Sequence, residues 1–143
     1  MGVMFKKILV PLDGSKLAEK ILPRVEWLAK IHDAEVTLLR VALAHTLPGM
    51  DPIQHQVHVV REAEEYLAKI ENDLKSVGVK VNSVVRYGHD AQEIVDHARD
   101  RNFDLIAMST HGRTGFSQFF LGSVASKVIN MATVPILLCR ACE

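Results

Sequence analysis

Short apolar segments of strand length alternate with segments of helical periodicity along most of this chain. The expected strands are residues 7–12, 35–41, 79–87, 104–108 and 134–139. Between them, apolar residues recur every three or four positions in residues 15–31, 57–77, 90–98 and 121–132, which indicates amphipathic helices. Strands that alternate with helices favour βαβ units and a parallel sheet. With 143 residues, the chain is expected to form one α/β domain spanning residues 1–143.

The third expected strand differs from the others because its apolar residues alternate with polar ones. Val79, Val81 and Val85 alternate with Lys80 and Arg86, which is the pattern of a strand exposed on one face, so we place it at an edge. The nearly continuous apolar runs of the other strands suit parallel strands buried on both faces. This combination predicts a doubly wound, Rossmann-like or flavodoxin-like sheet of order 3-2-1-4-5 or 2-1-3-4-5, with helices on both faces.

Several residues mark the expected boundaries of these elements. Pro23 lies inside the first helical segment and should kink that helix or shift its start. Asp90 is expected to cap the third helix. Pro135 cannot donate to a strand ladder, which favours the beginning of the fifth strand or a sheet edge. Residues 42–54 show no periodicity, so we expect a loop or flap beside the site.

Charge and hydropathy exclude several classes of function. The chain carries 17 acidic and 17 basic residues without a block of like charge, which argues against nucleic acid as the main partner because a phosphate backbone requires a basic face. No apolar run approaches the roughly 20 residues that span a bilayer. The first residues lack the apolar core of a signal peptide. We therefore expect a cytoplasmic protein without a membrane partner.

The cysteines and histidines fit no compact metal motif. Cys139 and Cys142 form a C-x2-C pair, but zinc would require two further ligands at suitable spacing. Free thiols in a reducing compartment are the favoured interpretation, and a redox role stays open. His45, His55 and His58 lie in or near the loop of residues 42–54 at spacings that suit no metal. They are interpreted as solvated side chains.

Residues 108–123 combine the end of an apolar run, several glycines and the start of a helix. Gly112 and Gly115 permit positive φ and close approach of a ligand to the backbone, and Gly122 with Ser123 precedes the helical segment. Free N–H groups of such a loop and of the first helical turn can hold an anion such as phosphate. The alternative is a tight turn with Ser123 as a helix cap. Neither of the two common phosphate-binding signatures is present.

The spacing Ser109-x2-Gly112-x9-Gly122-Ser123 resembles the G-x2-G-x9-G-[ST] motif of nucleotide-binding universal stress proteins. Ser109 replaces the first glycine of that motif, and Gly115 is an additional glycine. The segment P-L-D-G-S at residues 11–15 also resembles the first nucleotide-contacting segment of this family. The resemblance extends from Phe5 to Arg140. It implies the strand order 3-2-1-4-5, in which the loops after the first and fourth strands are neighbours.

The resemblance also implies a ligand and the residues that bind it. The ligand would be ATP, or ADP or AMP, with Mg²⁺ or Mn²⁺. Asp13 would contact the nucleoside or a metal-bound water, and the backbone of Val41 would contact adenine. The phosphates would lie on N–H groups from 112–115 and 122–123, supported by the Ser109 and Ser123 hydroxyls. The expected site comprises Pro11, Asp13, Val41, Ser109, His111, Gly112, Arg113, Gly115, Gly122, Ser123 and Val124.

Several alternatives remain open at this stage. Asp13 or Ser15 could simply cap the next helix, and Arg113 could point either to phosphate or to solvent. His111 could act as a base in ATP hydrolysis, although the residues indicate slow turnover at most, and the resemblance implies a regulatory role in a stress response. The rivals are a phosphate-transferring enzyme, a binder of AMP or a cyclic nucleotide, and a dimeric interaction module without nucleotide. We expect a homodimer through the apolar fifth strand.

Overall fold

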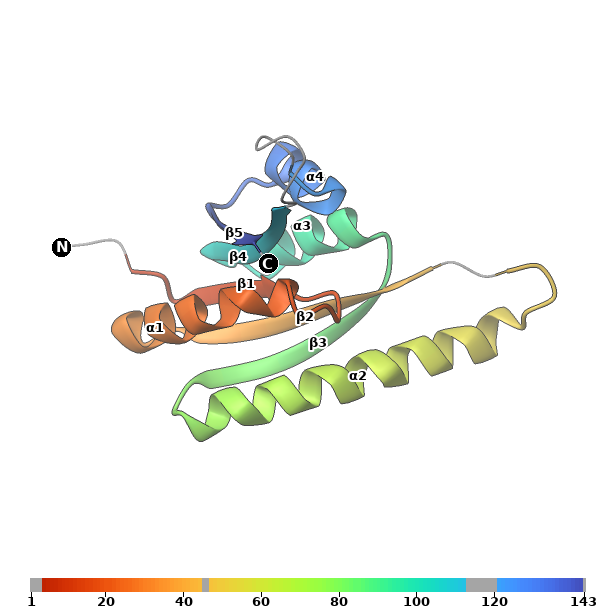
Figure 1. The fold of residues 1–143 in the computed structure, drawn as a ribbon, viewed down its shortest axis with the longest axis horizontal. Coiled ribbons are helices and arrows are strands. Elements are labelled where there is room, and N and C mark those ends of the chain that lie inside the picture. The colour runs from red at the N-terminus through yellow and green to blue at the C-terminus, as the bar shows by residue number, and fades with distance from the viewer. Residues whose placement is uncertain (1–3, 45–46, 113–120, 143) are drawn as a thin grey trace.

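The computed structural model describes residues 4–44, 47–112 and 121–142. Its single sheet has five parallel strands in the order β3-β2-β1-β4-β5 (Figure 1). The strands are β1 (Lys7–Pro11), β2 (Glu35–Leu43), β3 (Lys80–Gly88), β4 (Leu105–Gly112) and β5 (Ile136–Cys142). The order 3-2-1-4-5 and the edge position of the third strand are thus confirmed.

Helices cover both faces of the sheet and enclose two apolar cores. The helices are α1 (Leu22–His32), α2 (Pro52–Ser76), α3 (Asp90–Asp100) and α4 (Ser123–Met131), and a short 3-10 helix, η1 (Ala18–Ile21), precedes α1. Residues of α1 and α2 pack with Ile8 and Val10 on one face. Residues of α3 and α4 pack with Leu9 on the other face. This alternation of buried residues along β1 explains its continuous apolar sequence.

Two helices begin at positions that differ from the sequence prediction. Pro23 lies in the first turn of α1, where its missing N–H costs nothing, so it shifts the start of that helix. Helix α2 begins at Pro52 instead of residue 57. The Asp51 carboxylate accepts a hydrogen bond of 3.0 Å from the N–H of Ile53, which is the geometry of a helix N-cap. The expected loop of residues 42–54 is therefore shortened at both ends.

A third boundary prediction, at α3, is also wrong. Asp90 is the first residue of the helix, and the N-cap position belongs to His89. The Asp90 carboxylate accepts a 2.7 Å hydrogen bond from the N–H of Ala91, so this side chain still satisfies a donor of the first turn. Pro135, by contrast, lies immediately before β5, as expected for a residue that cannot donate to the ladder.

Strand β4 is longer than its apolar run. It was predicted to end at Met108, but its pairing with β5 continues to the pair Gly112–Cys142. Ser109, His111 and Gly112 therefore lie in a strand and not in a loop. The polar sequence S-T-H ends the apolar pattern, while main-chain hydrogen bonds to β5 continue the ladder. Side-chain pattern alone does not reveal such an extension.

His97 makes folding stability depend on pH. This α3 side chain is only 7% exposed, and its ring centroid lies 5.5 Å from that of Phe103. Burial lowers the pKa of His97, and the charges of Arg86 and Arg101 lower it further. The unfolded chain, with a histidine pKa of about 6.5, therefore binds this proton more readily than the folded chain. The contribution of neutral, buried His97 to folding stability is therefore complete above about pH 6.5. It is lost as the pH falls toward the folded-state pKa.

We expect the free energy of unfolding to fall between about pH 7 and pH 5, because protons favour the unfolded state over this interval. Replacing His97 by glutamine should flatten that dependence, as measured by urea unfolding across the same pH range. The control is His58→Gln, since the His58 side chain is 77% exposed. An equal pH dependence in wild type and His97→Gln would contradict the assignment.

Candidate functional site

A cavity of about 620 Å³ opens beyond the carboxyl ends of β1, β2 and β4. It brings together residues from the first loop, the end of β2, the end of β4 and the start of α4. Seven of the residues expected from the sequence line it: Pro11, Asp13, Val41, Ser109, Gly122, Ser123 and Val124. A position beyond the carboxyl ends of strands, at the point where the order reverses, is where ligands bind in doubly wound sheets.

The loop after β1 is a tight turn held by two hydrogen bonds from main-chain N–H groups to side chains. The exposed Asp13 carboxylate accepts a 2.8 Å hydrogen bond from the N–H of Ser15. The Ser15 hydroxyl in turn accepts one of 3.1 Å from the N–H of Ala18, at the start of η1. Gly14 between them has φ +88°, a conformation that costs a residue with a side chain roughly 1–2 kcal/mol. Asp13 therefore stabilises the turn itself and does not cap η1 or α1, and it still lines the cavity.

Strand β2 continues past the point where β1 ends. The β1–β2 ladder ends at the pair Pro11–Leu39, followed by one hydrogen bond of 2.9 Å from the N–H of Leu12 to the carbonyl of Leu39. On the other side, β2 pairs with β3 as far as Leu43. In a parallel ladder, alternate residues direct both main-chain groups to the same neighbour. The N–H and C=O of Val41 therefore point toward the β1 side of β2. Because β1 has already ended at this level, these groups face the cavity.

The start of α4 presents free N–H groups to the same cavity. Thr110 is 2% exposed, and its hydroxyl accepts a 3.1 Å hydrogen bond from the N–H of Gly122. This donor, expected to bind phosphate, is therefore already used within the protein. Gly122 is the N-cap residue and Ser123 the first residue of the helix, so Ser123 is not the cap. The N–H groups of Ser123, Val124 and Ala125 have no acceptor among the residues that the structure describes, so they are the donors that this turn offers.

Ser109, which replaces the first motif glycine, has its side chain on the other face of β4. Met108 packs in the core beneath α3 and α4, and Thr110 bonds to Gly122 at the start of α4. Side chains alternate along a strand, so Ser109 faces away from α4. Its hydroxyl is buried and has no hydrogen-bond partner among the described residues. The serine thus leaves the approach to the α4 N-terminus open, and its hydroxyl is not directed at that turn.

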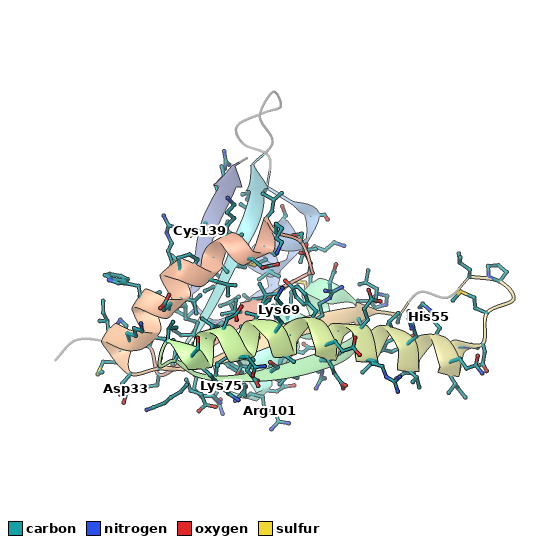
Figure 2. All side chains as sticks on the ribbon, turned by 60° about the horizontal axis from the view of Figure 1, so that its bottom comes forward. Asp33, His55, Lys69, Lys75, Arg101 and Cys139 are labelled. Carbon is teal, nitrogen blue, oxygen red and sulfur yellow. The ribbon has the colours of Figure 1, made fainter. Side chains whose placement is uncertain are left out.

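Sequence reasoning missed several residues that line the cavity: Arg40, His55, Val59, Glu62, Asp90 and Ile94. Three of them, His55, Val59 and Glu62, share one face of α2, and Figure 2 shows His55 near the start of this helix. His55 is half-buried, whereas a solvated loop side chain was expected. Asp51 followed by Pro52 was the local signal that the helix begins before it.

Some predicted residues cannot be placed. Arg113 and Gly115 lie outside the described residues, and only the backbone of His111 and Gly112 is described, at the end of β4. Within residues 4–44, 47–112 and 121–142, no group of three or more His, Cys, Asp or Glu side chains could hold a metal ion. None of the helices in the described part of the chain is long and apolar enough to cross a membrane.

These features define a doubly wound α/β protein with a cavity at its switch point. Residues 4–140 match the model of the universal stress protein family. The chain belongs to this family.

Relatives and solved structures agree with this assignment. Universal stress protein MJ0577 of Methanocaldococcus jannaschii is 32% identical, with 98% of each chain covered. The solved structure of MJ0577 superposes with a TM-score of 0.86 over 99% of both chains. Universal stress protein YxiE of Bacillus subtilis is 31% identical over 96% of this chain and all of its own length. More distant structures share the fold, among them a universal stress protein in complex with cAMP at 19% identity and TM-score 0.66.

Proposed function

We propose that this protein binds an adenine nucleotide in the 620 Å³ cavity, with ATP and Mg²⁺ or Mn²⁺ as the ligand, and acts as a cytoplasmic regulator of a stress response. One observation carries the proposal. The main-chain groups of Val41 and the N–H groups at the start of α4 have no partner in the described parts of the chain, and they face the same cavity. The first can pair with a base edge, and the second with phosphate. The volume lies in the usual range for such ligands.

The base end of the proposed complex lies at β2. The Watson–Crick edge of adenine offers an acceptor, N1, beside a donor, the exocyclic amine. This edge is complementary to the N–H and C=O of Val41. Guanine presents a carbonyl where adenine has the amine, so two acceptors would face each other. Pro11 and the partly buried Val41 side chain supply apolar contact from the cavity wall.

The phosphate end lies at α4, on the far side of β1. Phosphate oxygens would accept from the N–H groups of Ser123 and Val124 and from the Ser123 hydroxyl, where the helix dipole also favours negative charge. Asp13 would accept from a ribose hydroxyl or hold a metal-bound water. Ser109 contributes its backbone and leaves the approach open. The phosphate-binding site would be completed by the motif residues His111, Gly112, Arg113 and Gly115.

Family structures and the site chemistry support a nucleotide-binding regulator. Universal stress proteins in complex with cAMP and with dAMP share this fold at 19% and 22% identity. Hydrolysis needs a placed base in addition to bound metal and phosphate. One oxygen of Asp13 is already bonded to Ser15, so this carboxylate is partly engaged. We infer slow turnover at most, with His111 as the candidate base.

The direct test starts from freshly purified protein. Denaturation followed by mass spectrometry should release ATP or ADP, and calorimetric titration with ATP and Mg²⁺ should give micromolar affinity. GTP should bind at least tenfold more weakly, because the loss of one well-placed hydrogen bond and the repulsion of two acceptors together exceed about 1.4 kcal/mol. A protein that is purified without nucleotide and binds neither ATP nor GTP would contradict the proposal. The dimeric interaction module without nucleotide would then be the favoured alternative.

We further propose a homodimer through β5. This strand ends the sheet on one side, and an unpaired edge is a template for another strand. An apolar groove of about 550 Å³ adjoins it, lined by Trp27, Ile136 and Leu137 among others, and Trp27 is 64% exposed. Light scattering at micromolar concentration should give twice the 15.9 kDa chain mass. A monomer would contradict this assembly.

A further inference from the structure

Arg40 lies on β2 immediately before Val41. Because side chains alternate along a strand, Arg40 points to the face of the sheet opposite Val41, which is the face on which Leu38 is buried. Its guanidinium carbon is 5.1 Å from the ring centre of Tyr66 on α2, within the range of a cation–π contact. On the first loop, the position of a Cβ atom at Gly14 would be 2.3 Å from Arg40 Nη1. The guanidinium is thus held between α2 and the turn after β1.

The Tyr66 ring on which the Arg40 guanidinium stacks is itself held in place. The Tyr66 hydroxyl donates a 3.0 Å hydrogen bond to Glu19 Oε2 on η1. Burial raises the pKa of Tyr66, and the Glu19 carboxylate raises it further. The phenol therefore stays protonated and keeps its bond to Glu19. Because the ring is fixed, the guanidinium that stacks on it is fixed as well.

The donors of this guanidinium have no acceptor in the described part of the protein. Arg40 is half-buried and lines the cavity, yet it forms no hydrogen bond or ion pair with any described residue. Asp13 on the adjacent turn bonds to Ser15 instead. Arginine carries five N–H donors in a geometry that matches phosphate. A fixed, half-buried guanidinium that faces the cavity and has no acceptor among the described residues points to an anionic group of the ligand.

The strand order shows which part of the ligand Arg40 faces. Strand β1 lies between β2 and β4, so a nucleotide that extends from Val41 to the start of α4 has its ribose beside the turn after β1. Arg40 lies over Gly14 in that turn. The 5′-phosphates on α4 are on the other side of β1. An anion at Arg40 is therefore a second group, at the ribose.

We propose that Arg40 binds a phosphoryl group on the ribose 2′ or 3′ oxygen, so that the cavity selects adenine nucleotides phosphorylated at the ribose as well as at the 5′ position. This inference rests on the proposed nucleotide site. The other charged side chains of known placement in the cavity wall include the carboxylates of Asp13, Glu62 and Asp90, which repel a second phosphate. The positive charge of Arg40 offsets this repulsion.

The test compares adenosine 5′-monophosphate with adenosine 2′,5′- and 3′,5′-bisphosphate, which differ from it by one phosphate. Calorimetry on the wild type should show at least one bisphosphate binding tenfold more tightly or better, consistent with charge-assisted bonds to arginine. In Arg40→Gln this ratio should fall to about one or below. In Tyr66→Leu it should fall severalfold, because the guanidinium loses its platform. Arg61→Gln, an exposed residue of α2 outside the cavity wall, is the charge-matched control and should keep the ratio.

Three results would overturn the inference. A wild-type ratio of about one with measurable monophosphate binding would reject the ribose phosphate and leave the nucleotide site intact. Binding of inorganic phosphate to the monophosphate complex, abolished in Arg40→Gln, would show that Arg40 takes a separate ion. No binding of any adenine nucleotide, ATP included, would reject the proposed function and this inference together.

Discussion

Replacing Ser123 by proline is expected to weaken ATP binding at least tenfold while the fold stays intact. Proline removes the N–H of the first residue of α4, one of the free donors proposed for phosphate. A hydrogen bond to a charged group is worth about 1.5–3 kcal/mol, which corresponds to a tenfold loss or more. The helix itself should tolerate the change, because proline is favoured at this position.

The residue before Ser123 also suits a proline at that site. Gly122 has φ −56° and ψ 155°, an extended conformation that proline prefers in its predecessor. Its N–H would still donate to the Thr110 hydroxyl, and its carbonyl would still accept from Ser126. Thermal unfolding followed by circular dichroism should therefore show little change in melting temperature.

The matched control is Ser123→Ala, which deletes the hydroxyl and retains the N–H. It should cost severalfold at most if main-chain donors carry the phosphate. Equal losses in the two variants would assign the contact to the hydroxyl, and unchanged affinity in Ser123→Pro would remove the α4 N-terminus from the site. Calorimetric titration with ATP and Mg²⁺ distinguishes these results.

The parts of the fold that the sequence predicts well are those in which local pattern and burial coincide. Residues 8–11 are apolar because both faces of β1 are covered, with Ile8, Leu9 and Val10 fully buried. The alternating pattern of β3 reflects its place at the sheet edge. Such patterns report how many faces of a strand are buried. The choice of 3-2-1-4-5 over 2-1-3-4-5 needed the family resemblance, because strand order depends on long-range packing.

The errors arose where main-chain pairing is independent of side-chain type. Strand β4 continues to Gly112 because β5 supplies a partner, although the sequence S-T-H has no apolar pattern. The sequence predicts that the N–H of Gly122 binds phosphate, whereas its bond to Thr110 joins the end of β4 to the start of α4. In the sequence, Arg40 is only one residue of the strand predicted at 35–41. Its contacts with Gly14 and Tyr66 come from segments distant in sequence, so no local signal indicates them.

Gly14→Ala is expected to destabilise the fold by about 2–3 kcal/mol and to disturb the ligand cavity at the same time. Two costs combine. A residue with a side chain at φ +88° loses roughly 1–2 kcal/mol. The new Cβ would also lie 2.3 Å from Arg40 Nη1 and 3.0 Å from its Cζ, so the guanidinium must leave its place on Tyr66 and forfeit a contact worth on the order of 1 kcal/mol.

Gly78→Ala is the control that separates these two costs. Gly78 has φ +89°, nearly the same as Gly14, and a Cβ there would meet nothing within 4 Å. It should show the conformational cost alone in urea unfolding, with nucleotide affinity unchanged. The excess loss in Gly14→Ala then measures the clash with Arg40. It should shrink in the double variant Gly14→Ala, Arg40→Ala, because residues in contact have non-additive effects. Equal losses at the two glycines, or strict additivity in the double variant, would show that the guanidinium does not pack on this turn. The position of Arg40 beside the ribose end of the cavity depends on that packing.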